Sequence, residues 1–205
     1  MSVATLAAPK PLSMLTTVRV RVGWFGFNAG SAVAADNSAA MAMLVTHLSA
    51  AAGSLAWMAM EWIRHGKPSV LGIVTGMVAG LGTITPASGF VGPGGALIIG
   101  ILAGFICFNA TLFIKRVLKI DDSLDVFPVH GVGGILGTLL TAVFASNALG
   151  LFAGQEDISI GSQFGVQALG VAATLVYTAI VSFVLLKLTE ALVGNRVPEE
   201  EEVEG

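Results

Sequence analysis

The feature that most constrains this chain is a run of 47 residues without a formal charge, residues 68–114. A helix crosses the hydrocarbon core of a bilayer in about 20 residues, so this run is long enough for two membrane spans. The stretch PASGFVGPGG, residues 86–95, separates the two spans, because proline and glycine interrupt helices. Three other uncharged runs are each long enough for one span: 37–60, 126–155 and 158–186.

The sequence therefore predicts an all-α fold, a polytopic bundle of transmembrane helices. Five full spans are expected near residues 38–61, 69–86, 93–115, 126–146 and 161–188. A partial span precedes them, because the apolar segment 22–35 has only 14 residues, and Arg19 and Arg21 stand where it would have to continue. This segment is interpreted as the end of a membrane helix whose beginning is missing.

Composition agrees with a membrane protein. Hydrophobic residues make up 55% of the chain and charged residues 11%, whereas soluble domains have about 25% charged residues. Glycine is abundant, with 26 residues, and recurs four residues apart in three spans, which gives helices a flat stripe for close packing. The stripes are Gly72/Gly76/Gly80, Gly100/Gly104 and Gly133/Gly137. The single cysteine, Cys107, lies in an apolar run and is interpreted as a small buried side chain.

Loop charges predict the orientation of the spans. Segments 64–68 (RHGKP) and 115–122 (KRVLKIDD) are basic, whereas the loop with Glu156 and Asp157 is acidic. Because lysine and arginine favour the cytoplasmic side, both basic loops and the C-terminus are expected in the cytoplasm, with the spans in a plasma or inner membrane. The net charge of −3 comes largely from the acidic tail, so no nucleic-acid binding is predicted.

His130, in DVFPVHGVGGILG, is the main candidate functional residue, because an ionisable side chain inside a membrane usually faces a bundle interior or a cavity. One interpretation is a structural histidine that donates a ring N–H to a carbonyl. The other is a pore-lining imidazole that handles a small polar solute or a proton. Pro128 keeps the backbone before it irregular. Asp125 is expected to give structural support at the start of this helix, by capping it or by complementing its dipole.

Two further histidines are given less weight. His47 has no acid or proline nearby, so a packing role or a position facing lipid is expected, and His65 lies in a basic loop where it is solvated. The sequence contains no HExxH, GxSxG or Walker motif, and no acid or hydroxyl partner for His130 is evident within a span. No enzyme activity, no metal site and no cofactor are therefore predicted.

The stretch WFGFNAGS, residues 24–31, combines aromatic and polar side chains. Aromatic rings near a membrane surface commonly form an interfacial belt, which is one interpretation. The alternative is a binding site, because Asn28 and Ser31 accompany the rings of Trp24 and Phe27 at helical spacing. Aromatic rings attract a cation through their quadrupole, and Phe27 could also close a pore.

Five stretches resemble, in order, the ammonium transporter family (Amt/Mep/Rh), on its Amt side. They are WFGFNAGSA, EWIRHGKPSVLG, TPASGFVGPGGALIIG, DDSLDVFPVHGVGGILG and the acidic RVPEEEEVEG. The resemblance implies that His130 is the second-half member of a pair of pore histidines and that Phe27 is one of two stacked gating phenylalanines. Ser31, with Trp24 nearby, resembles part of an outer ammonium recruitment site. The family also implies a homotrimer that conducts ammonium, with ammonia and a proton passing separately through one pore per subunit.

The resemblance covers the second inverted repeat and the last helix of a fold with eleven spans. Residues 1–21 stay unmatched, residues 22–190 form a transmembrane half-domain, and residues 191–205 form an acidic cytoplasmic tail. We therefore expect a truncated or split channel subunit in the lipid bilayer, completed by a complementary first-half chain. The alternative is a non-conducting remnant, or a regulatory subunit that joins full-length transporters. A PII signalling protein is a candidate partner, although the short tail argues against it.

Overall fold

The computed structural model describes residues 10–146, 159–197 and 201, with side chains from Arg19 onwards. Every regular element in these ranges is helical, as predicted. They are α1 (Lys10–Gly30), α2 (Asn37–His65), α3 (Val70–Ile84), η1 (Thr85–Ala87), α4 (Pro93–Leu112), η2 (Phe113–Val117), η3 (Phe127–Val132), α5 (Gly133–Phe144) and α6 (Ile160–Leu192). The short element η1 is a 3₁₀ turn, whereas η2 and η3 are π-helices.

Five helical segments are long and apolar enough to cross a membrane, and each coincides with a predicted span. They are Asn37–His65, Val70–Ala87, Pro93–Val117, Phe127–Phe144 and Ile160–Leu192. The prediction of five full spans is therefore confirmed, and their ends differ from the predicted ends by only a few residues. The chain is a multi-pass membrane protein.

Helix α1 is longer than the partial span expected at residues 22–35. It has 21 residues, so Arg19 and Arg21 lie within the helix and do not precede it. It ends at Gly30, and a turn follows in which the Val33 N–H donates to the Gly30 carbonyl at 3.0 Å. The helix therefore has the length of a membrane span but carries two arginines near its middle.

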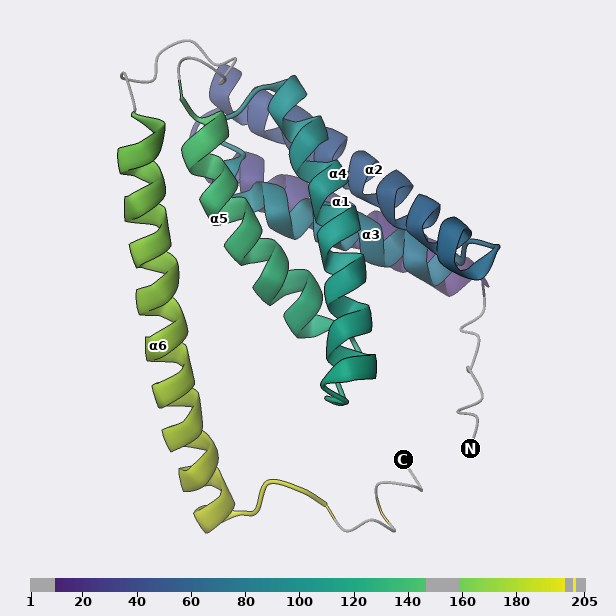
Figure 1. The fold of residues 1–205 in the computed structure, drawn as a ribbon. Coiled ribbons are helices and arrows are strands. Elements are labelled where there is room, and N and C mark those ends of the chain that lie inside the picture. Colours follow the sequence, from purple (N-terminus) through teal and green to yellow (C-terminus); the bar gives the residue numbers. More distant parts are fainter. Residues whose placement is uncertain (1–9, 147–158, 198–200, 202–205) are drawn as a thin grey trace. The chain divides into compact units, whose positions relative to one another are not determined.

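The chain divides into two compact units, Met1–Phe164 and Gly165–Gly205. In the first unit, α2 packs against α3 and α4, α1 packs against α2, and α5 packs against α3 and α4 (Figure 1). The described part of the second unit consists mainly of α6, which is apolar around its whole circumference. A helix of this kind is typical of a membrane interior.

Close contact between α2 and its two neighbours depends on glycine. A Cβ atom at Gly80 of α3 or at Gly100 of α4 would overlap the Ser49 carbonyl of α2, and one at Gly53 would overlap the carbonyl of Gly76. Ser49 also donates its hydroxyl to the Gly80 carbonyl at 2.9 Å. The predicted glycine stripes therefore form helix contacts in which the backbones touch.

The connection between α2 and α3 is fixed by side-chain caps. Gly66 ends α2 with φ +75°, a left-handed conformation that glycine adopts without strain. Ser69 caps α3 by accepting the Gly72 N–H at 2.9 Å. The Glu61 carboxylate accepts both the N–H and the hydroxyl of Ser69, at 2.6 and 3.0 Å. These bonds hold the N-terminus of α3 against the last turns of α2.

Cys107 is fully buried, which confirms the prediction of a small buried side chain. It belongs to an apolar cluster that includes Trp57, Phe108 and Val129. These residues come from α2, α4 and η3, so the cluster holds the π-helix that carries His130 against the rest of the first unit.

Candidate functional site

The structure brings the two ends of the predicted site together, because the rings of Trp24 and His130 stack. Their centroids lie 6.4 Å apart and their planes differ by 20°. The Trp24 indole N–H donates to the Thr85 hydroxyl at 2.9 Å, and that hydroxyl donates to the Leu81 carbonyl at 2.8 Å. The indole is therefore held in one orientation by α3 and η1, with the imidazole against its face.

The π-helical turn η3 presents His130. Pro128 lies near the start of this turn and has no N–H to donate. The π-helical turn agrees with the irregular backbone that was predicted before His130. Pro128 and Val129 are buried, whereas His130 is exposed. No described residue makes a hydrogen bond to the imidazole of His130. A structural role for His130 would require a hydrogen bond from its ring to a carbonyl, and the described residues contain no such bond.

Phe27 and Ser31 lie beside Trp24 at the Gly30 end of α1. The Phe27 ring meets Trp24 edge-on, with centroids 6.4 Å apart and planes at 78°, and 61% of its surface is exposed. Ser31 is exposed and donates its hydroxyl to the Phe27 carbonyl at 2.7 Å. The sequence-predicted residues of α1 are thus neighbours, and two of them face outwards from the described bundle.

Asn28, from the same stretch, lies on the other side of α1. It is 5% exposed, and its side-chain amide donates to the Thr46 hydroxyl of α2 at 2.9 Å. Thr46 in turn donates to the Ala42 carbonyl at 2.6 Å. Asn28 therefore joins α1 to α2 and does not share the exposed face with Phe27. The helical spacing of Asn28 in the sequence could not tell a place in the binding site from a hydrogen bond between helices.

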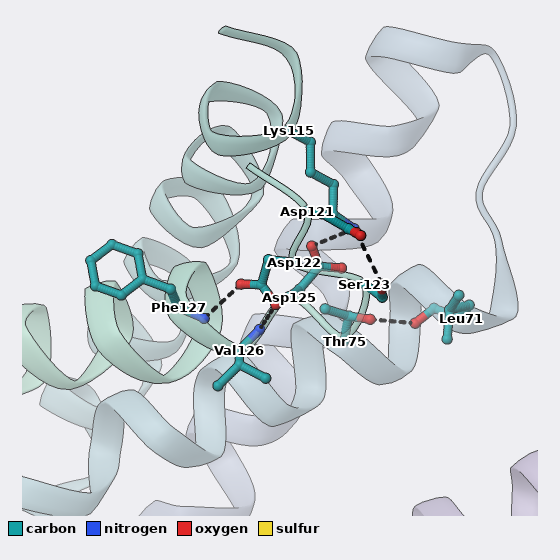
Figure 2. Close-up of polar contacts among 9 residues, drawn as sticks. All are labelled: Leu71, Thr75, Lys115, Asp121, Asp122, Ser123, Asp125, Val126 and Phe127. Atoms are coloured by element: carbon teal, nitrogen blue, oxygen red, sulfur yellow. Dashed lines mark hydrogen bonds and ion pairs between the residues drawn. The ribbon is translucent and has the colours of Figure 1, made fainter. Parts of the chain in front are cut away.

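Asp125 supports η3, but it does not cap it. Its carboxylate pairs with the Lys115 ammonium at 2.7 Å, which ties the end of α4 to the start of η3. The capping carboxylate is Asp122, which accepts the N–H groups of Val126 and Phe127 at 2.9 and 2.8 Å (Figure 2). Sequence reasoning missed Asp122 because a capping side chain normally lies two or three residues before the N–H it binds. The sequence signal for a capping carboxylate here was the group of three aspartates in DDSLD, residues 121–125.

The other histidines lie away from this site. His47 is exposed and contacts Phe25, with ring centroids 5.9 Å apart, which fits the expected packing or outward-facing position. His65 is the exposed last residue of α2 and lies 6.3 Å from the Phe108 ring. In the described part of the chain, no three metal-binding side chains come together.

The arrangement presents an exposed imidazole beside the Trp24 ring, with the Phe27 ring on the same helix as Trp24. A neutral imidazole has one donor and one acceptor nitrogen. Neither nitrogen is used by a described residue, so the ring can form hydrogen bonds with a molecule beside it. Such a site suits a small polar molecule that both donates and accepts hydrogen bonds.

Comparison with known proteins identifies the family of this chain. The sequence model of the Ammonium Transporter Family matches residues 2–205, a match that includes residues 2–21, which the motifs had left outside the resemblance. The ammonium transporter of Aquifex aeolicus is 46% identical over 196 residues, which are 95% of this chain and 46% of the relative. That of Bacillus subtilis is 43% identical over 182 residues, 88% of this chain and 45% of the relative. The chain thus spans about half the length of these relatives.

Solved structures give the same result. Saccharomyces cerevisiae Mep2 superposes with a TM-score of 0.80 at 38% identity, over 88% of this chain and 44% of that one. A structure titled Sensor Amt Protein superposes with a TM-score of 0.86 at 33% identity, over 95% of this chain and 47% of that one. From this evidence, the chain belongs to the ammonium transporter family.

Proposed function

We propose that this chain moves ammonium or ammonia across the membrane, as a channel subunit that supplies one half of a histidine-lined pore. The observation that carries the proposal is the stacking of the exposed His130 imidazole on Trp24, with both ring nitrogens free of described partners. Relatives named ammonium transporters match nearly the whole chain, which supports the same substrate.

An apolar pore with an imidazole favours ammonia over its cation. Moving a charged ammonium ion into a low-dielectric passage is costly, so loss of a proton before entry lowers the barrier. Neutral ammonia then needs hydrogen-bonding partners that apolar walls lack. His130 can supply them, because it is exposed beside Trp24 and no described residue forms a hydrogen bond to its ring nitrogens.

Phe27 and Ser31 are suited to the outer mouth of the same pathway. The Ser31 hydroxyl donates to the Phe27 carbonyl, so its oxygen still has lone pairs that can accept an N–H from ammonium. The exposed Phe27 ring lies edge-on to Trp24, where it can close the way to His130. The two residues thus serve recruitment and gating, respectively.

The remainder of the pore, with a second histidine, comes from residues outside this sequence. Its source is a complementary first-half chain or another part of a longer chain. We place the completed assembly in the plasma or inner membrane as a homotrimer, with the basic loops and the C-terminus in the cytoplasm. A PII signalling protein is a further candidate partner on the cytoplasmic side.

Growth on limiting ammonium tests the proposal. A transporter-deficient strain would express this chain alone, a chain with the first five helices of a full-length relative, or both. We expect rescue only with both chains, and loss of rescue with His130→Ala. His47→Ala is the matched control, because this exposed histidine contacts Phe25 away from the site. No growth with both chains present in the membrane would contradict the proposal and would favour a remnant or a regulatory subunit.

A further inference from the structure

Two π-helices flank the loop between α4 and α5 along the sequence. Element η2 ends α4, and η3 begins the span that carries His130. Lys115 lies inside η2, and Asp125 lies two residues before η3, so their 2.7 Å ion pair connects the two elements. Isolated π-helical turns are uncommon and occur often at functional sites. The Lys115–Asp125 ion pair therefore links two such elements.

The start of η3 is held by one carboxylate. Asp122 accepts the N–H of Val126 through one oxygen and the N–H of Phe127 through the other. Its own carbonyl accepts the Asp125 N–H at 3.2 Å, and Asp125 has φ +55°, an uncommon conformation for a residue other than glycine. The turn is therefore closed by hydrogen bonds on both sides, and the Lys115 ion pair holds its strained residue in place.

The hydrogen bonds from Val126 and Phe127 to Asp122 control the hydrogen-bonding register of η3. A π-helix pairs each N–H with the carbonyl five residues earlier, whereas an α-helix pairs it with the carbonyl four residues earlier. If the first N–H groups lose their acceptor, the turn can shift towards α-helical pairing. Side chains in η3 would then rotate about the axis relative to α5. His130 is the fourth residue of η3, so its ring would move away from Trp24.

We propose that Asp122 is a positioning residue for His130, and that the Lys115–Asp125 ion pair assists it by fixing the turn. Together they hold the π-helical register that places the imidazole on the Trp24 face. The significance of this placement for transport rests on the proposed function, whereas the placement itself can be measured without any transport. Carboxylate hydrogen bonds to backbone N–H groups are charge-assisted and strong, which suits this role.

Fluorescence of Trp24 reports the placement directly. In the full chain with Trp57→Phe and Trp62→Phe, Trp24 is the remaining indole. A protonated imidazole in contact with indole quenches its fluorescence, and histidine changes charge between about pH 5 and 8. Helices α3 and α4, which pack against η3, carry no charged residue, and the charged side chains described on α1 are those of Arg19 and Arg21. His130→Ala should abolish the quenching on acidification, and His47→Ala on α2 should leave it unchanged.

Asp122→Ala should remove most of this quenching, and Asp122→Asn, which keeps one acceptor oxygen, should remove part of it. Lys115→Met should also weaken it. The matched control is Asp121→Ala, because among the described residues the Asp121 carboxylate accepts only the Ser123 hydroxyl, at 3.1 Å (Figure 2). Helix content measured by circular dichroism verifies folding. If Asp122→Ala loses its helices, Asp122→Asn decides the question.

Quenching as strong in the folded Asp122 variants as in the parent would overturn the positioning role. Loss of quenching in Asp121→Ala to the same degree would also overturn it, because the effect would then be a general result of lost charge. A chain that shows the expected fluorescence but never supports transport would leave this inference intact and would count against the proposed function alone.

Discussion

The His130 imidazole stacks on the Trp24 indole with a centroid distance of 6.4 Å and 20° between the ring planes, and the indole donates a hydrogen bond to Thr85. This ring pair joins α1 to η3. Each of the three side chains can be replaced separately, so the contribution of each contact can be measured.

Removing the indole should reduce transport in the completed channel. Trp24→Leu deletes the surface on which His130 rests, and loss of such orientation lowers rates by about tenfold or more. Uptake of labelled methylammonium, measured with the complementary chain present, checks this. Trp62→Leu is the control, because Trp62 is exposed and makes no ring contact with His130. Equal uptake by Trp24→Leu and the parent would show that the stacking has no role.

A methyl group at Gly80 should destabilise the bundle. The Cβ of Gly80→Ala would overlap the Ser49 backbone carbonyl, which cannot move without shifting α2. Overpacking of this kind costs about 1–3 kcal/mol, which thermal denaturation in detergent would detect.

Gly82→Ala is the matched control in the same helix. The nearest atom to its new Cβ is the Val129 carbonyl oxygen at 3.9 Å, an ordinary contact. Alanine is favoured over glycine in a helix by about 0.5–1 kcal/mol, so this variant should be neutral or slightly stabilised. The account of the glycine contacts fails if Gly80→Ala melts at the parent temperature.

Arg21 should limit the stability of α1. Its guanidinium donates to the Met77 sulfur at 3.3 Å, while its buried Nε has no acceptor among the described residues. A buried donor without a partner costs about 1–3 kcal/mol, so Arg21→Leu should raise the melting temperature. Arg19→Leu serves for comparison, since Arg19 is exposed and should respond less. A lower melting temperature for Arg21→Leu would mean that the guanidinium has a stabilising partner after all.

The helices could be predicted because uncharged runs of membrane length have few other solutions. The spans at 38–61 and 93–115 correspond to Asn37–His65 and Pro93–Val117, and glycine stripes correctly indicated the close contacts of Gly80 and Gly100. The first helix was predicted too short, because arginine within an apolar segment normally ends a membrane span. The contact of Arg21 with Met77 of α3 is part of the packing of this helix, which periodicity does not reveal.

The roles of His130, Trp24 and Phe27 stay predictions from residue type. The stacking of Trp24 on His130 was not predicted, because it depends on how α1 lies against Thr85, at the end of α3. Asp125 was expected as a possible cap, and the structure gives that role to Asp122 instead. Asp122 lies four and five residues before the N–H groups that it binds, because the turn closed by the Asp125 N–H on the Asp122 carbonyl comes between them. The sequence does not signal the φ of +55° at Asp125, which is uncommon for a residue other than glycine.

Methylammonium flux into liposomes shows whether His130 takes part in the pathway. This chain is reconstituted together with the first five helices of a full-length relative. The account predicts flux only when both chains are present, abolished by His130→Ala and unchanged by His47→Ala. Flux from the two chains that persists in His130→Ala at the parent rate would contradict it, because the imidazole would then have no part in the pathway.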